Sequence, residues 1–245
     1  MSIPLSSSAR SVLVSGGSSG IGAAIARAFV AQGCRVVATG VSEAEVAAAR
    51  HQPGFSAIDL RVLDVRDGAA VTALVASLAR LDVLVNCAGA IRRAGAEHDP
   101  EVFAEILDIN LSGTMRLCAA ARSKLAAQRG CIINTASMLS FFGGGLVPGY
   151  SASKGGVAQL TKSLAIAYAA EGIRVNAVAP GWIATPLTQP LHSDPARSDP
   201  IVARTPLGRW GTPEDVVGPV LFLASPAAQF VTGVILPVDG GYLIA

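Results

Sequence analysis

The chain has 245 residues, 51% of them hydrophobic and 15% charged, which is the composition of one α/β domain with a buried sheet and no disordered part. The formal net charge is +2, and the 19 Lys and Arg residues form no run longer than Arg92-Arg93, so we expect no nucleic-acid partner. No apolar run approaches the about 18 residues of a membrane span, and Met1 to Arg10 has no apolar core, so we expect neither a membrane segment nor a signal peptide.

Strand and helix patterns alternate along the chain. Short apolar strands are predicted at 11–15, 35–39, 57–64, 82–86, 130–135, 174–179 and 234–238. Helical periodicity is predicted at 23–32, 43–50, 67–80, 100–109, 112–128, 149–171 and from Pro213 onward, where Thr212 precedes Glu214 and Asp215 as an N-terminal cap. This order predicts an α/β fold, a doubly wound parallel sheet with helices on both faces, in a single domain spanning 1–245.

The segment 182–212 breaks the alternation. It is poor in periodicity and contains Pro186, Pro190, Pro195, Pro200 and Pro206. A loop this long inside a compact domain is usually functional, so we predict that it is a substrate-binding lid.

Four cysteines are spread widely through apolar segments, at positions 34, 87, 118 and 131. This spacing fits neither a disulfide framework nor a metal site, so we predict small core residues. We expect a soluble protein in the reducing cytoplasm, with no bound metal.

A glycine-rich turn follows the first predicted strand and precedes the first helix. Gly16, Gly20 and Gly22 give it the spacing G-x-x-x-G-x-G. Such a turn lets the backbone approach a pyrophosphate, and the free N–H groups of the following helix bind its charge. The alternative is a tight turn with no ligand; the position directly after the first strand favours a dinucleotide.

Further candidates follow the carboxyl ends of the other strands, where open α/β sheets bind their ligands. Asp64 is placed to meet the adenine amino group or, alternatively, only to cap the next helix. The residues expected to contact the cofactor are Gly16, Ser18, Ser19, Gly20, Ile21, Gly22, Asp64, Val65, Asn86, Ala88, Gly89, Tyr150, Lys154, Pro180, Gly181, Ile183 and Thr185.

The charge after the second strand bears on the choice between NAD and NADP. The 2′-phosphate of NADP requires a basic partner, and Ser18, Ser19, Gly40, Val41 and Ser42 supply none. We therefore expect NAD to be favoured over NADP. The acidic side chain that usually binds the ribose hydroxyls of NAD is missing, because Gly40 stands in its place.

Tyr150 and Lys154 are four residues apart on a predicted helix, so their side chains lie on one face. A free tyrosine titrates near pH ~10, and a unit charge about 4 Å away at an effective dielectric near 20 is enough to bring it toward neutrality. Ser137 can hydrogen-bond the same substrate oxygen. By itself Tyr-x-x-x-Lys also occurs by chance on helices that only cover a core; the glycine turn and Asn86-Cys-Ala-Gly89 favour the catalytic interpretation.

Taken in order, these motifs resemble those of the short-chain dehydrogenase/reductase family. The resemblance runs from about Val12 to Leu243 and also includes Pro180-Gly181 with Thr185 and Val238-Asp-Gly-Gly241. Ser15 and Cys87 depart from the usual threonine and asparagine, which are mild changes.

The resemblance implies a Rossmann-like sheet of about seven strands and a catalytic tetrad of Asn110, Ser137, Tyr150 and Lys154. Tyr150 is the implied acid/base and Ser137 polarises the substrate oxygen. Lys154 binds the nicotinamide ribose and lowers the tyrosine pKa, and Asn110 holds a water. Members of the family are commonly homotetramers, so we expect one here.

Local strings resemble those of 2-keto-3-deoxygluconate 5-dehydrogenases, also described as 2-deoxygluconate 3-dehydrogenases. They are Ala90-Ile-Arg-Arg93, Ala136-Ser-Met-Leu-Ser-Phe141, Val147-Pro148 and Pro206-Leu-Gly-Arg-Trp-Gly211. The implied substrate is a small molecule, a 2-keto-3-deoxy sugar acid of the gluconate, fuconate or rhamnonate type. An arginine guanidinium binds a carboxylate with two parallel hydrogen bonds, so we expect an arginine at the substrate. The expected substrate contacts are Arg92, Arg93, Met138, His192 and Arg209.

Two other functions share these motifs. An NADPH-dependent 3-oxoacyl thioester reductase, acting on an acyl carrier protein, uses the same tetrad, and a basic docking patch would favour it. A dinucleotide-sensing regulator would keep the fold without the chemistry. The four intact tetrad positions argue against the regulator.

Overall fold

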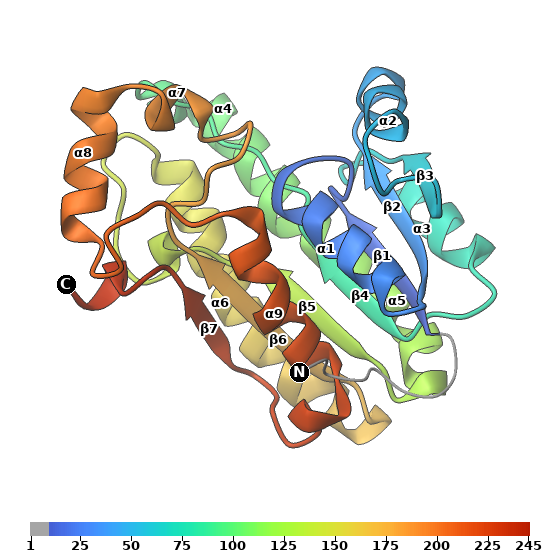
Figure 1. Ribbon diagram of the computed structural model, residues 1–245. Coiled ribbons are helices and arrows are strands. Elements are labelled where there is room, and N and C mark those ends of the chain that lie inside the picture. Colours follow the sequence, from blue (N-terminus) through green and yellow to red (C-terminus); the bar gives the residue numbers. More distant parts are fainter. Residues whose placement is uncertain (1–9) are drawn as a thin grey trace.

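The computed structural model describes residues 10–245 as one seven-stranded sheet with helices on both faces (Figure 1). All neighbouring strands are parallel and run in the order β3-β2-β1-β4-β5-β6-β7. The strands are β1 Ser11–Ser15, β2 Arg35–Gly40, β3 Ile58–Val62, β4 Val83–Asn86, β5 Cys131–Thr135, β6 Arg174–Pro180 and β7 Ile235–Val238. This confirms the predicted doubly wound, Rossmann-like sheet.

The helices bury their apolar faces in two cores, one on each side of the sheet. On one side, α1 and α9 pack together, and the core includes Phe29 and Val220. On the other, α3, α5 and α6 contribute residues such as Leu74, Leu117 and Leu164. The helices are α1 Gly20–Ala31, α2 Glu43–Arg50, α3 Gly68–Ser77, α4 Pro100–Leu107, α5 Gly113–Gln128, α6 Pro148–Tyr168, α7 Gln189–His192, α8 Pro195–Arg204 and α9 Pro213–Ala224.

The strand order reverses direction between β1 and β4. The chain builds β1, β2 and β3 outward to one edge, then crosses back and builds β4 to β7 toward the other edge. Loops leaving the carboxyl ends of β1 and β4 therefore diverge and leave a crevice, which is where open α/β sheets bind ligands. The glycine turn follows β1, and Asn86-Cys-Ala-Gly89 follows β4.

The segment 182–212 is not the irregular loop that its prolines predict, because it contains two helices. Asp194 caps α8 by accepting a hydrogen bond from the Ala196 N–H, and Pro195 stands at its first position, where a missing N–H costs nothing. Ile201 of α8 and Leu191 of α7 pack into a cluster with Trp210 and Tyr242. The segment was predicted as irregular from its prolines, but burial of apolar residues in this cluster stabilises short helices.

The other boundaries differ from prediction by a few residues at most. The predicted helix 149–171 is α6 followed by a 3₁₀ turn at Ala169–Glu171, and α4 passes into α5 through a π-helical turn, Asp108–Ser112. Within the described residues no helix is long and apolar enough to cross a membrane. The expectation that no signal peptide precedes Arg10 lies outside the described residues.

Candidate active site

A cavity of about 610 Å³ lies along the carboxyl ends of β1, β2, β3 and β4. The glycine turn and the ends of β2 and β3 line one end of it, and Tyr150 and Lys154 line the other. Twelve of the predicted cofactor contacts line this cavity: Gly16, Ser19, Gly20, Ile21, Gly22, Asp64, Val65, Ala88, Gly89, Tyr150, Lys154 and Thr185.

The glycine turn is shaped by close backbone approaches. Gly16 has φ +64, and a Cβ there would lie 2.6 Å from the Ala88 nitrogen. A Cβ at Gly22 would lie 2.2 Å from the Gly16 carbonyl oxygen, so a side chain at either position would force β1, α1 and the turn after β4 apart. The first turn of α1 thus stays open to the cavity.

Tyr150 and Lys154 share one face of α6, as their spacing predicts. The Lys154 Nζ lies 5.6 Å from the centre of the Tyr150 ring and donates a 2.7 Å hydrogen bond to the Thr135 carbonyl oxygen at the end of β5. Lys154 is buried, and its burial lowers the pKa of its ammonium to about 8. The lysine is therefore close to its titration point at physiological pH.

The phenol of Tyr150 behaves differently from the expectation. Burial raises its pKa, while the Ser137 hydroxyl and then the Arg93 guanidinium act in the opposite direction. Burial is the largest of these effects, and the expected lowering of the tyrosine pKa by Lys154 is not observed. The tyrosine is accordingly protonated at neutral pH in the ligand-free protein.

Asn110 lies in the π-helical turn between α4 and α5 and is fully buried. Its Oδ1 accepts a hydrogen bond from the Ala90 N–H, and its Nδ2 donates to the Ala90 carbonyl oxygen and to the Ser153 Oγ of α6. The side chain therefore ties the loop after β4 to α6. Such π-helical turns are frequent at functional sites.

Ser137 follows β5 and caps a 3₁₀ turn, Met138–Ser140, through a hydrogen bond from the Leu139 N–H to its Oγ. The Ser140 Oγ accepts from the Ser137 N–H and donates to the Lys154 carbonyl oxygen at 2.7 Å. Ser140 thereby couples the position of Ser137 to that of α6, a role that its sequence context did not indicate.

Glu97 is a second residue that the sequence analysis missed. It is 1% exposed, and its two carboxylate oxygens accept hydrogen bonds from the N–H groups of Arg92 (2.7 Å) and Tyr150 (2.7 Å). A carboxylate at the first turn of α6 is favoured by the helix dipole. Glu97 thus fixes the loop after β4 against the start of α6, directly behind the tyrosine.

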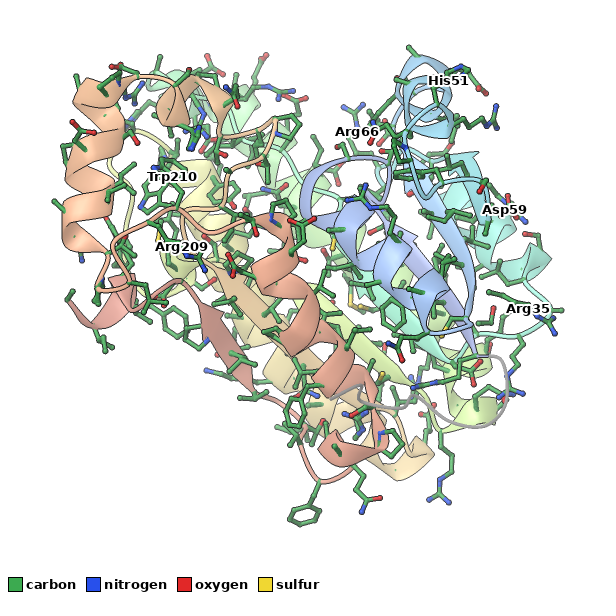
Figure 2. All side chains as sticks on the ribbon, in the orientation of Figure 1. Arg35, His51, Asp59, Arg66, Arg209 and Trp210 are labelled. Atoms are coloured by element: carbon green, nitrogen blue, oxygen red, sulfur yellow. The ribbon has the colours of Figure 1, made fainter. Side chains whose placement is uncertain are left out.

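Asp64 lies at the other end of the cavity, on the α2 side of the molecule, where Figure 2 shows Arg66. Its carboxylate pairs with the Arg66 guanidinium at 2.6 Å, and this hydrogen bond lowers the pKa of Asp64. It also accepts from the Arg66 N–H rather than capping α3, which Asp67 caps.

The whole chain from the glycine turn to its last residues matches one family. A family model described as Enoyl-(Acyl carrier protein) reductase matches residues 16–243. The chain belongs to the short-chain dehydrogenase/reductase family. It is therefore an NAD(P)-dependent oxidoreductase acting on CH–OH groups, as the motif order indicated.

Several relatives of this short-chain dehydrogenase are named as dehydrogenases of carboxylic acids. It is 42% identical to the 2-dehydro-3-deoxy-D-gluconate 5-dehydrogenase of Bacillus subtilis, over 96% of this chain and 94% of that protein. It is 44% identical to the cis-4-hydroxycyclohexanecarboxylate dehydrogenase of Sinomonas cyclohexanicum, over 95% of this chain and 96% of that protein. A crystal structure of a putative NAD(P)-dependent gluconate 5-dehydrogenase from Beutenbergia cavernae, with bound NADP at low occupancy, superimposes with a TM-score of 0.90 at 40% identity, covering 99% and 100% of the two chains.

Five predicted cofactor contacts of the dehydrogenase do not line the cavity. Ser18 and Asn86 are buried beneath it, and the Asn86 amide donates to Asn134 in the core. Pro180 ends β6 in the interior, a Cβ at Gly181 would touch Asp239, and Ile183 lines a second cavity. The structure therefore does not place these five residues on the surface of the cavity.

The predicted substrate contacts of the dehydrogenase separate into two groups. Arg92 lines the cavity, where it pairs with Glu105, and Arg93 lies near Tyr150, whose pKa its charge lowers. Arg209, by contrast, pairs with Asp215 beside a second cavity of about 480 Å³. Figure 2 shows Arg209 and Trp210 on the side of the molecule where α8 lies in Figure 1. The structure does not bring Arg209 to the tyrosine.

Met138 lies in the 3₁₀ turn after β5 and His192 ends α7, and both are close to Trp210. Met138 is buried in the cluster with Trp210 and Tyr242, and the His192 ring packs edge-on against Trp210 at 5.1 Å between centroids. Neither lines the cavity that holds Tyr150. Both side chains pack in or against the cluster that contains Trp210.

A dinucleotide fits the residues present. The glycine turn leaves the first turn of α1 uncovered, and the Cβ that Gly20 lacks would come within 3.5 Å of Thr185 across the cavity. The cavity continues without interruption from there to Tyr150. A nicotinamide dinucleotide bound along it supplies the hydride acceptor or donor of the reaction.

Proposed function

We propose that the protein oxidises a secondary hydroxyl of a 2-keto-3-deoxy sugar acid to a ketone, with NAD as hydride acceptor. The observation that carries this proposal is that Tyr150 and Lys154 line one cavity, with the Ser137 hydroxyl and the Arg93 guanidinium beside the phenol. The 42% identity to a dehydrogenase of that substrate class supports it.

Each of the four tetrad residues has its own role in the proposed reaction. Ser137 donates a hydrogen bond to the substrate oxygen. Tyr150 first releases its own proton to solvent, and the resulting phenolate takes the proton of the substrate hydroxyl as general base. Lys154 hydrogen-bonds the nicotinamide ribose, and its ammonium stabilises the phenolate. Asn110, Ser140 and Glu97 hold the loops that carry these groups, through the hydrogen bonds described above.

Arg93 is the candidate for binding the substrate carboxylate. Burial and then the neighbouring Arg197 guanidinium of α8 lower the pKa of Arg93. The Arg93 Nη2 also donates to the Leu187 carbonyl oxygen, 3.1 Å away in the lid. Two cations facing one another favour an anion between them, and a guanidinium binds a carboxylate with paired hydrogen bonds. We propose that segment 182–212 closes over the substrate and brings Arg197 to it.

The proposal extends to NAD preference, oligomeric state and location. No basic side chain of the described residues follows β2 before α2. A homotetramer is supported by exposed apolar side chains such as Ile166 on the long helix α6. A reducing cytoplasm is supported by the four free cysteines, three of them buried.

The deciding experiment follows the absorbance of reduced cofactor with purified protein. The substrates are 2-keto-3-deoxygluconate and its fuconate and rhamnonate counterparts, each with NAD and with NADP. We expect turnover of one of them with NAD. Arg93→Ala should raise the KM of the sugar acid at least tenfold with little change in kcat. The matched control Arg209→Ala should change neither constant. Equal effects of the two variants would contradict the role of Arg93.

The second candidate function is reduction of a 3-oxoacyl thioester with NADPH. The observation behind it is the description of the matching family, which names a reductase of substrates on an acyl carrier protein, there an enoyl group rather than a 3-oxoacyl group. Absence of turnover on the three sugar acids, together with NADPH-dependent reduction of an acetoacetyl thioester, would establish this activity instead. The assignment of Tyr150 and Lys154 would be unaffected.

A further inference from the structure

A carboxylate from α2 occupies the end of β2, where the sequence showed no acidic residue. Glu45 lies in the first turn of α2, and its side chain is directed back toward the sheet. Its Oε1 accepts a hydrogen bond from the Ser18 Oγ at 2.5 Å, and its Oε2 accepts from the Val41 N–H at 2.9 Å. The carboxylate is thus anchored at both oxygens.

Gly40 explains why the carboxylate comes from α2. A Cβ at Gly40 would lie 2.9 Å from the Ser18 Oγ and 3.2 Å from a methyl group of Val46. An aspartate at position 40 would therefore displace Ser18 or α2. With glycine there, the buried Ser18 hydroxyl remains free to bind Glu45.

Glu45 belongs to the cofactor cavity rather than to the outer surface. It lines the cavity together with Ser19, Gly40 and Val41, and it is half-buried. Ser18 and Ser19 belong to the glycine turn that receives the pyrophosphate, so the carboxylate lies on the adenosine side of that turn. The neighbouring Glu43 of the same helix turn is exposed to solvent.

The cations that line the cavity do not neutralise Glu45. Arg66 forms its ion pairs with Asp64 at 2.6 Å and Glu105 at 3.9 Å, and Arg92 pairs with Glu105 at 3.0 Å. Lys154 lies at the opposite end, next to Tyr150. The field at the end of β2 is therefore negative, which favours hydroxyl donors and disfavours a phosphate.

We infer that Glu45 is the residue that selects NAD over NADP: its carboxylate accepts hydrogen bonds from the adenosine ribose hydroxyls and repels a 2′-phosphate. The inference rests on the proposed NAD-dependent function and names the residue responsible for it. An acidic group that binds the ribose 2′-hydroxyl is one way in which dinucleotide folds reject NADP. In this chain, that group is supplied by a helix and positioned by Ser18 and Val41.

The test measures binding without turnover. Dissociation constants of NAD and NADP are determined by isothermal titration calorimetry on the full chain, for the wild type, Glu45→Gln and Glu43→Gln. The glutamine at 45 can still accept from the Val41 N–H and donate to the Ser18 hydroxyl, so the fold is retained while the charge is lost. Glu43→Gln removes the same charge from the same helix turn without touching the cavity.

We expect Glu45→Gln to tighten NADP binding at least tenfold relative to NAD, which is about 1.4 kcal/mol. Glu43→Gln should change the ratio less than twofold. Salt screens charge repulsion, because the Debye length shortens as the salt concentration rises. The preference of the wild type for NAD over NADP should therefore shrink between about 0.05 and about 0.5 M salt. The preference of Glu45→Gln should not change with salt.

Two results would overturn the inference in distinguishable ways. An unchanged NAD to NADP ratio in Glu45→Gln, with NAD still bound, would reject Glu45 as the selecting residue and leave the dehydrogenase function standing. Failure of the wild type to bind either dinucleotide would reject the proposed function itself. Glu45→Ala, which removes the whole carboxylate, must shift the ratio in the same direction as Glu45→Gln.

Discussion

The two ends of the cofactor cavity are built by different physical means. At the tyrosine end, buried groups form hydrogen bonds that solvent water cannot replace. The Glu97 carboxylate, for example, accepts from the N–H groups of Arg92 and Tyr150. At the adenosine end, half-exposed charges form pairs, as Asp64 does with Arg66. Unpaired buried groups cost more than screened surface pairs contribute. Substitutions at the tyrosine end should therefore have the larger effects.

The largest effect is expected for the phenol itself. Tyr150→Phe removes the general base and leaves the ring in place, so kcat/KM should fall at least ~1000-fold, about 4 kcal/mol. The NAD dissociation constant should change less than about twofold, because the lining of the cavity is otherwise unaltered. Steady-state kinetics and titration calorimetry on the same preparation test both parts. Turnover at the wild-type rate would remove Tyr150 from the mechanism.

A smaller effect is expected for the carboxylate behind the tyrosine. Glu97→Ala leaves the N–H groups of Arg92 and Tyr150 without partners in the interior, so the free energy of unfolding should fall by about 3 kcal/mol. Urea unfolding measures this. Glu101→Ala, on the exposed side of the first turn of α4, is the control and should change stability by less than about 0.5 kcal/mol. Similar values for the two variants would show that Glu97 is not a structural anchor.

The buried ammonium of Lys154 should destabilise the protein at neutral pH. Its pKa falls from 10.5 to about 8 on folding, so the unfolded chain binds more protons, and stability rises with pH between about 8 and 10.5. Lys154→Met should therefore raise the free energy of unfolding at pH 7 by about 2 kcal/mol, after allowing about 1 kcal/mol for the lost hydrogen bond to Thr135.

The gain from Lys154→Met should shrink at pH 10, because the wild-type lysine is then neutral in the folded protein. Urea unfolding at pH 7 and pH 10 tests the sign and the pH window. Lys162→Met on the exposed face of α6 provides the matched control and should show no such pH dependence. Destabilisation by Lys154→Met at pH 7 would mean that the ammonium is better solvated than its burial indicates.

The smallest effect is expected at the adenosine end. Asp64→Asn removes a partly exposed ion pair with Arg66, so stability and the NAD dissociation constant should each change by less than about 1 kcal/mol. The effect should decrease further in salt. Calorimetry at two salt concentrations is the measurement. A rise of a hundredfold or more in the NAD dissociation constant would contradict this prediction and show that Asp64 binds the adenine directly.

Local signals were sufficient to predict the sheet and most of the cavity. Gly16, Gly20 and Gly22 follow an apolar strand, and Tyr150 and Lys154 share a helical spacing, so periodicity and turn chemistry placed them. The groups that support them were missed because they act over long sequence separations. Glu97 contacts Tyr150 across 53 residues and Glu45 contacts Ser18 across 27, and neither distance leaves a pattern in the sequence.

The helices of segment 182–212 escape prediction for a different reason. Prolines favour an irregular segment, although Asp194 followed by Pro195 is a helix start. Arg209 was grouped with Arg93 because both lie near motifs of the family, but the structure separates them between two cavities. A charge in a loop can be assigned to a site only when its partner is known, and Asp215 was the partner.

Pro237 of the edge strand β7 bears on the behaviour of the protein in solution. The carbonyl oxygens of Val234 and Val238 accept hydrogen bonds from the β6 side, so the backbone of residue 237 faces outward. A proline there removes one donor from the open edge of the sheet. Edge strands with free donors recruit other strands and seed aggregation. The proline thereby protects the β7 edge of the sheet, and Pro237→Val should make the protein more prone to precipitate.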